Sequence, residues 1–309
     1  KDVVLGFDNV EQYSNFRRTP SDFGASIGRY ANRINKGKIV CDGDTIQLPQ
    51  NNFGHCLHGG PMGWQYQVYE ITATTDSSVT LVRNSPDGDA NFPGNVVATV
   101  VYTLDSQNRI NIDYTATTDK QTVINMTNHT YFNLHGDADQ NIENCILMVN
   151  ADKYTPVDRT YMPTGELASV EGTPFDFRNP TELSKDINNF ENEQVKFGNG
   201  FDHNWCLNTY NNETKTGDVN VAAASLYSPV TGIKVTVYTN EPGIQCYSGN
   251  FLDGKLTGKY GKVYKKHAGF CLETQKYPNT PNVDDWPSAY LNPGETYHSV
   301  QIVAFSVEK

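Results

Sequence analysis

Alternation of apolar and polar residues is the clearest structural pattern in this chain. Between residues 110 and 117, and again between 233 and 237, every second residue is apolar and the residues between them are polar. A period of two is typical of a β-strand with one buried face and one wetter face. Similar segments predict further strands near residues 67–74, 79–83, 96–104, 146–150, 219–224 and 299–307.

Helical periodicity is weak throughout the sequence. A short helix is expected only within residues 180–190, where Thr181 could cap it. Many short strands with turn residues between them favour an antiparallel sandwich or barrel over parallel βαβ units. No repeat, low-complexity tract or linker divides the chain, and the loop-rich stretch 154–200 retains apolar anchors such as Phe175 and Phe177. We therefore expect residues 1–309 to form one all-β domain, a large antiparallel β-sandwich with few short helices.

Composition and charge narrow the possible partners. The chain has 18 Tyr and 14 Phe, and aromatic residues suit the pleated, half-buried surface of a sheet. Lys and Arg number 24 against 35 Asp and Glu, a formal charge of −11, whereas a nucleic-acid binder needs a basic face. The longest apolar run, 96–104, is too short for a membrane span of ~20 residues, and no signal segment opens the chain. We expect a soluble protein that binds neither nucleic acid nor membrane.

The cysteines do not form a recognisable motif. The chain contains 6 Cys without any C-x-x-C pair, the spacing that a zinc or redox site would need. Most are expected to be small buried hydrophobic residues, although Cys41 and Cys56 could form a disulfide in an oxidising compartment. N-x-[ST] sequons begin at Asn125, Asn128 and Asn212, but such matches are common by chance. The compartment therefore stays open.

Two turn-like segments carry side chains that could bind a sugar. Arg33 offers a rigid fork of donors and Asn32 a donor and an acceptor, which suits vicinal hydroxyls; a surface arginine and a turn asparagine are the alternative. Further along, Gly59-Gly60 would let the backbone approach a ligand closely, and Trp64 could stack on a sugar face. Paired glycines are equally a good turn.

Three residues are candidates for proton transfer. His129 lies among Asn and Thr, and a histidine side chain can give or take a proton at working pH, although this one could also be a buried structural histidine. Asp202 and Glu273 each stand in apolar or aromatic surroundings, where burial raises the pKa of a carboxyl group toward that of a useful base. An ion pair is the alternative for Glu273, and Asp202 could instead cap a turn. The pair His55-x-x-His58 has no further ligand nearby, so no metal site is expected.

Seven segments, in order along the chain, together resemble the aldose 1-epimerases (galactose mutarotases). These segments are 3–8, 28–34, 57–60, 128–134, 200–204, 242–245 with 249–254, and 272–275. The resemblance implies a galactose mutarotase-like supersandwich, a large antiparallel β-sandwich whose sheet face binds a free hexose. It implies that Glu273 is the catalytic base and His129 the acid. It also implies that the sugar is bound by Asn32, Arg33, His58, Asp202 and Gln245.

The chain departs from the family pattern in two ways. The family normally has extra strands before the segment that matches residues 3–6, and we expect this chain to lack them. Cys246 stands where the family often has an aromatic residue, so its neighbour Gln245 could be oriented differently.

The implied activity is interconversion of the α and β anomers of free hexoses such as D-galactose and D-glucose. Proton transfer is the whole reaction, so no metal or organic cofactor is required. A glycosidase with Asp202 and Glu273 as its carboxylates is one alternative, but it leaves His129 without a clear role. A non-catalytic sugar-binding module is another, although it needs neither acid nor base. A monomer suffices and a dimer stays open; family habit favours the cytoplasm, with a periplasmic or secreted protein as the alternative.

Overall fold

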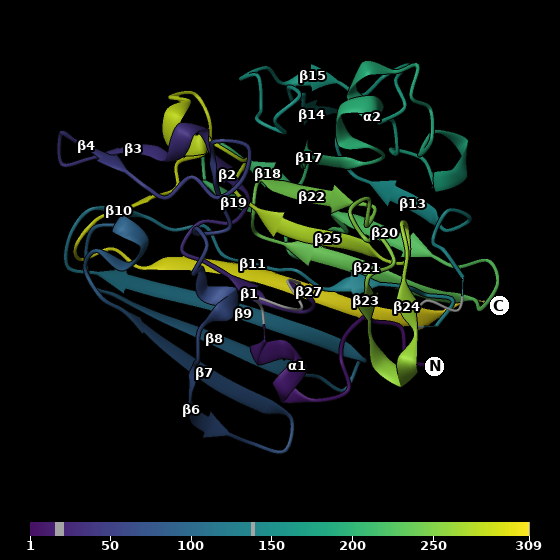
Figure 1. Cartoon of the computed structure of the whole chain (residues 1–309), viewed down its shortest axis with the longest axis horizontal. Helices are drawn as coiled ribbons and strands as arrows, with labels where there is room; N and C mark the ends of the chain where they lie inside the picture. The colour runs from purple at the N-terminus through teal and green to yellow at the C-terminus, as the bar shows by residue number, and fades with distance from the viewer. Residues whose placement is uncertain (16–21, 137–139, 309) are drawn as a thin grey trace.

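Two large antiparallel sheets form the body of the protein in the computed structural model, which describes residues 1–15, 22–136 and 140–308 (Figure 1). In spatial order, the larger sheet consists of β16 (Thr181–Glu182), β13 (Ile146–Val149), β20 (Ala224–Tyr227), β21 (Ile233–Thr239), β27 (Tyr297–Val307), β9 (Arg109–Thr118), β8 (Val96–Leu104), β7 (Ser78–Ser85) and β6 (Glu70–Thr74). The smaller sheet consists of β12 (Tyr131–Phe132), β25 (Phe270–Gln275), β22 (Gly243–Tyr247), β17 (Asp202–Cys206), β14 (Lys153–Thr155) and β15 (Ala168–Ser169).

Short two-stranded ribbons and single helical turns connect and cover these sheets. The ribbons pair β1 (Ser26–Ile27) with β11 (Thr127–Asn128), β2 (Arg33–Ile34) with β5 (Cys56–Leu57), β3 (Lys38–Cys41) with β4 (Asp44–Gln47), β10 (Thr122–Val123) with β26 (Tyr290–Leu291), β18 (Tyr210–Asn211) with β19 (Thr216–Gly217), and β23 (Leu256–Thr257) with β24 (Val263–Tyr264). The α-helices of the described residues are α1 (Val10–Ser14) and α2 (Glu193–Gly198). The 3₁₀ turns are Asn35–Gly37, Trp64–Tyr66, Asp89–Asn91, Leu183–Lys185, Lys259–Gly261 and Thr280–Asn282. No helix in the described part of the chain is long and apolar enough to cross a membrane.

The all-β prediction and most of the predicted strands are confirmed, but the predictions for two segments are wrong. Residues 219–223 form a turn ahead of β20, because the Asp218 carboxylate accepts the backbone N–H of Asn220 and ties the chain into a local loop. Residues 180–190 contain β16 and a 3₁₀ turn instead of an α-helix. Thr181 donates its hydroxyl back to the carbonyl of Asn179, and the backbone N–H of Leu183 donates to the carbonyl of Cys145, the residue just before β13. This segment is therefore held against the sheet edge.

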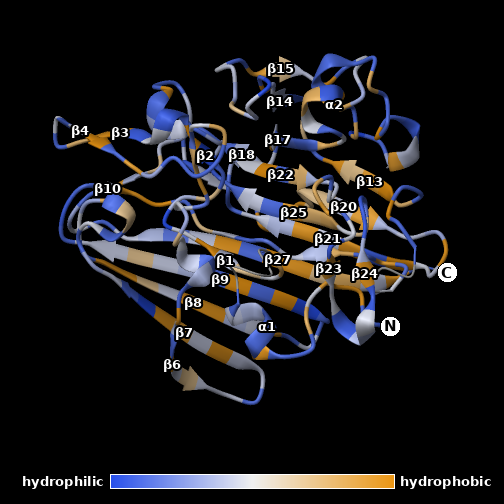
Figure 2. Ribbon diagram, in the orientation of Figure 1, coloured by the Kyte–Doolittle hydropathy of each residue, from blue (hydrophilic) through white to orange (hydrophobic). Residues whose placement is uncertain are grey.

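The main hydrophobic core lies between the two sheets. Figure 2 shows hydrophobic and hydrophilic residues alternating along β21, β27 and β9, as the sequence pattern predicts. From the smaller sheet, Leu272 and Trp205 point into this core, and Val237 meets them from the larger sheet. Burial of this apolar surface is the dominant favourable contribution to folding. All six cysteines are free and buried, so Cys41 and Cys56 form no disulfide.

The opposite face of the smaller sheet carries polar side chains. Adjacent residues of a strand point to opposite faces, so Glu273 on β25 faces away from the core that contains Leu272. The antiparallel register places Glu273 directly beside Gln245 on β22, and Tyr247 beside Asp202 on β17. This outer face is the floor of the site described next.

Candidate active site

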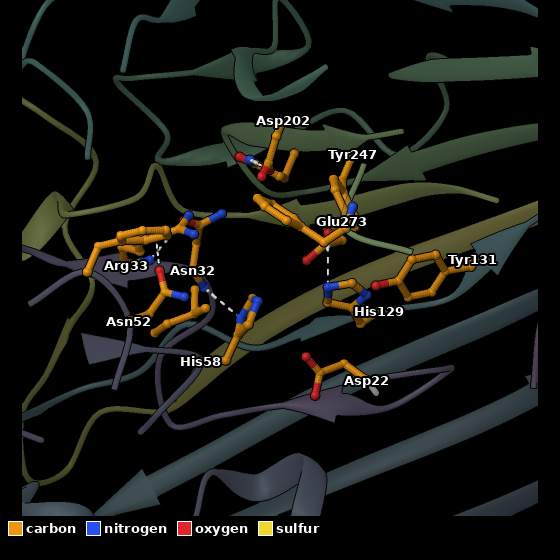
Figure 3. A pocket seen from close by; sticks show the side chains of 14 residues that line it. Asp22, Asn32, Arg33, Asn52, His58, His129, Tyr131, Asp202, Tyr247 and Glu273 are labelled. Atoms are coloured by element: carbon orange, nitrogen blue, oxygen red, sulfur yellow. Dashed lines mark hydrogen bonds and ion pairs between the residues drawn. The ribbon is translucent and has the colours of Figure 1, made fainter. Parts of the chain in front are cut away.

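A cavity of about 350 Å³ opens above the outer face of the smaller sheet (Figure 3). Its volume falls within the range of roughly 300–1,000 Å³ that is typical of small-molecule sites. The floor comes from β17, β22 and β25, and the walls come from the chain before β1, the β2–β5 ribbon and the turn between β11 and β12. Every residue that the family resemblance assigns to the site lines this cavity: Asn32, Arg33, His58, His129, Asp202, Gln245 and Glu273.

Glu273 and His129 face each other at the floor of the cavity. The Glu273 Oε1 atom lies 3.6 Å from the His129 Nε2 atom, and both side chains are almost completely buried. The other oxygen of Glu273, Oε2, has no hydrogen-bond partner within the described residues. Burial raises the pKa of Glu273 to about 7; the His129 imidazole opposes this rise, and the Asp202 and Asp22 carboxylates add to it. The carboxylate is therefore a much stronger base near neutral pH than an exposed glutamate.

The His129 ring is held in place from several sides. Its Nδ1 atom lies 3.6 Å from the Sγ atom of Cys271, which neighbours Glu273 on the same face of β25. The ring of Tyr131 packs against it at 5.0 Å between centroids, and the ring of His58 meets it edge-on at 5.4 Å. The backbone N–H of His129 donates to the carbonyl of Ala25 at 2.9 Å. This packing keeps Nε2 directed at Glu273.

The backbone fixes the tautomer of His58. The Nδ1 atom of His58 accepts the backbone N–H of Asn32 at 3.0 Å. Burial, followed by the nearby His129 and Arg33, holds the pKa of His58 well below its ordinary value, so the ring is neutral. A neutral ring that accepts at Nδ1 carries its proton on Nε2. His58 therefore offers a hydrogen-bond donor and no free lone pair to the cavity.

Arg33, Asp202 and Gln245 also line the cavity. The Nε atom of Arg33 donates to Asn52 at 3.1 Å, and its guanidinium lies 4.9 Å from the ring centroid of Tyr161. Gln245 donates from Nε2 to the Asp202 carboxylate at 2.7 Å, which leaves the buried Gln245 Oε1 without a partner among the described residues. Cys246 points into the core, and Gln245 still lines the cavity.

Two sequence-based ideas about the segment 57–64 are wrong. Trp64 does not reach the cavity; it is buried in the core beside the larger sheet, and its backbone N–H donates to the carbonyl of Gly28. Its ring packs so closely on Gly28 that a Cβ atom there would lie 2.1 Å from a ring carbon. Gly59 is likewise packed against the Gly28 carbonyl and does not line the cavity, so the paired glycines serve the turn.

Several lining residues were not singled out from the sequence. Tyr247 could have been found, because it alternates with Gln245 along β22. Leu57, Tyr131 and Phe251 fall within the family segments but carry no polar group that would single them out. Asp22, Asn52 and Phe53 come from loops without periodicity, so no local pattern marks them.

Two groups of residues within the described chain are close enough together to share a metal ion: Asp22, His58 and His129, and His129, Cys271 and Glu273. In the first group, the tautomer of His58 places a proton on the nitrogen that faces the cavity, which opposes ligation. In the second group, burial raises the pKa of Cys271 well above its ordinary value, so its thiol stays protonated. Both groups fit hydroxyl recognition and proton transfer better than metal binding.

The cavity places a buried carboxylate beside an imidazole among polar side chains, an arrangement suited to proton transfer on a small molecule. The sequence profile of the aldose 1-epimerase family matches residues 1–304. A galactose mutarotase from Homo sapiens is 44% identical over 99% of this chain and 84% of its own length. An aldose 1-epimerase from Escherichia coli is 38% identical over 100% of this chain and 86% of its own.

Structural comparison agrees with the sequence relatives. A crystal structure of an aldose epimerase homologue from C. elegans superimposes with a TM-score of 0.89 at 30% identity, covering 100% of this chain and 89% of that one. The chain belongs to the aldose 1-epimerase family, and its enzyme class is that of the isomerases.

Proposed function

We propose that this protein interconverts the α and β anomers of free aldohexoses such as D-galactose and D-glucose, with Glu273 as the base and His129 as the acid. The observation that carries the proposal is the 3.6 Å separation of Glu273 Oε1 and His129 Nε2 at the floor of the cavity. The two oxygens that exchange protons in this reaction, the anomeric hydroxyl and the ring oxygen, are bonded to the same carbon. An acid and a base must therefore lie close together to serve both.

The reaction begins with ring opening. Ionised Glu273 accepts the proton of the C1 hydroxyl, for which its unpartnered Oε2 atom is available. Protonated His129 donates to the ring oxygen while the bond between C1 and that oxygen breaks, giving the open-chain aldehyde. Rotation about the C1–C2 bond presents the other face of the aldehyde, and the ring closes as both protons return. Because the two transfers are coupled, no full charge develops on the sugar, and each transfer contributes ~10²–10⁴-fold to the rate.

The remaining polar residues hold the sugar. The His58 Nε2–H is a donor, the Arg33 guanidinium is a fork of donors, and Gln245 Oε1 is an acceptor without a partner in the described part of the chain. Asp202 adds a carboxylate that can accept from two adjacent hydroxyls, and Asn32 completes the wall beside Arg33. Buried acceptors without partners cost about 1–3 kcal/mol each. Sugar hydroxyls would satisfy them, which supports a polyol ligand.

We also propose that the protein is a monomer and that it resides in a reducing compartment. The six buried cysteines are all free, which fits the cytoplasm better than an oxidising compartment.

Polarimetry of freshly dissolved α-D-galactose tests the proposed activity. The optical rotation should relax to its equilibrium value faster in proportion to the protein added. A relaxation rate that is the same with and without protein would contradict the proposal. Nitrophenyl galactoside serves as the control substrate, because it has no free anomeric hydroxyl. Release of nitrophenol from it would indicate a glycosidase instead.

A further inference from the structure

One residue of the cavity, Asp22, has no part in the reaction as described above. It lies just before β1, and its carboxylate is within 4.8 Å of a ring nitrogen of both His58 and His129. Figure 3 shows Asp22 and Glu273 on opposite sides of the His129 ring. The cavity therefore has a second carboxylate next to the proposed acid, on the side away from the proposed base.

The environment of Asp22 leaves one oxygen available. The Tyr66 hydroxyl hydrogen-bonds the carboxylate, while the buried Oδ1 atom has no hydrogen-bond partner within the described residues. Burial raises the pKa of Asp22, and His129 and Tyr66 oppose that rise. A buried carboxylate oxygen without a partner is costly, unless it accepts a hydrogen bond from a ligand.

The proposed pose of the sugar decides what Asp22 would meet. Only two carbons, C1 and C5, are bonded to the ring oxygen that faces His129. Glu273 is on the C1 side, because it takes the anomeric proton. The far side of His129, where Asp22 lies, is therefore the C5 side. The substituent on C5 differs between classes of aldose: it is a hydroxymethyl group in hexoses, a methyl group in 6-deoxyhexoses, hydrogen in pentoses and a carboxylate in hexuronates.

Asp22 and His58 together match a hydroxyl group. Asp22 Oδ1 is an acceptor, and the Nε2–H of His58 is a donor, because His58 accepts the Asn32 N–H at its other nitrogen. We propose that Asp22, with His58, recognises the 6-hydroxyl of the sugar, so that this protein prefers aldohexoses to 6-deoxyhexoses, pentoses and hexuronates. The inference rests on the proposed function, since the pose follows from the roles of Glu273 and His129.

The experiment compares kcat/KM, measured by polarimetry, for D-galactose and 6-deoxy-D-galactose. A hydrogen bond to a charged group typically changes such a constant by about 10- to 100-fold. The wild-type protein should prefer galactose by that factor, and Asp22→Ala should bring the ratio of the two constants close to one. Asp22→Asn keeps an acceptor but removes the charge. It should retain part of the preference and should reduce the discrimination against D-galacturonate. Asp76→Asn, an exposed residue in the turn between β6 and β7, is the matched control and should leave both ratios unchanged.

The outcomes separate the two proposals. If the wild-type protein accelerates mutarotation of both sugars with equal kcat/KM, the inference about Asp22 is wrong while the proposed function stands. If Asp22→Ala lowers both constants by the same factor, Asp22 acts through His129, and the C5 assignment is likewise overturned. If the wild-type protein accelerates neither sugar, the proposed function itself fails. If Asp22→Ala does not fold, the test remains decisive, because the ratio of the two kcat/KM values in the wild-type protein and the behaviour of Asp22→Asn each test the inference.

Discussion

Replacing Glu273 with glutamine should stabilise the fold at alkaline pH while it removes the proposed base. The pKa of Glu273 is raised from 4.5 to about 7 by burial, so the folded state binds more protons than the unfolded state between these values. Such a group contributes its full stability below pH 4.5, and this contribution is lost as the pH rises through 7. At about 1.4 kcal/mol per pKa unit, the raised pKa lowers the free energy of unfolding, relative to acid pH, by about 1 kcal/mol at pH 5 and about 3 kcal/mol at pH 8. The amide of the Glu273→Gln variant does not titrate, so the variant avoids this loss of stability.

Urea denaturation at pH 5 and pH 8 measures the effect. The advantage in unfolding free energy of Glu273→Gln over the wild-type protein should grow by about 2 kcal/mol between the two pH values. Glu213→Gln, at an exposed turn residue between β18 and β19, is the control and should show no such growth. A difference between Glu273→Gln and wild type that does not depend on pH would refute the argument that burial raises the pKa of this carboxyl group.

Three further predictions concern the cavity and its surroundings. Because Glu273 must be ionised to accept a proton, kcat/KM for galactose should fall as the pH drops through about 7, which a pH–rate profile would show. Arg33→Lys loses the Nε hydrogen bond to Asn52 and the contact with the ring of Tyr161, so KM should rise about 10-fold with little change in kcat. An unchanged KM would show that Arg33 does not bind the sugar. Trp64→Leu should lower the free energy of unfolding by about 2 kcal/mol and leave KM unchanged, since the ring is in the core. A raised KM would instead indicate that Trp64 stacks on the sugar.

The regular part of the fold could be predicted from the sequence because period-two patterns report directly on buried strand faces. That signal was strong for β9 and β21, where each polar residue sits between two apolar ones. It failed at residues 219–223, where a hydrogen bond from the backbone N–H of Asn220 to the Asp218 carboxylate overrides an apolar stretch. Local propensity cannot anticipate such a bond.

The residues of the candidate site could be predicted from the sequence only in part. Residues of the family motifs, such as His129 and Glu273, could be named from the sequence, although their separation could not be given because it depends on pairing between distant strands. Trp64 looked available for stacking, since nothing in the sequence says that the backbone of Gly28 lies against its ring. Asp22 precedes β1 in an aperiodic segment, and only the tertiary structure places it beside His129.

The most direct test of the central claim is a double-mutant cycle on Glu273 and His129, with kcat for α-D-galactose followed by polarimetry. If the two residues transfer protons in one coupled step, Glu273→Gln and His129→Asn should each lower kcat by at least ~10² without unfolding the protein. The double variant should then be little slower than the worse single variant. Near-wild-type kcat in either single variant, or fully additive losses in the double variant, would contradict the account.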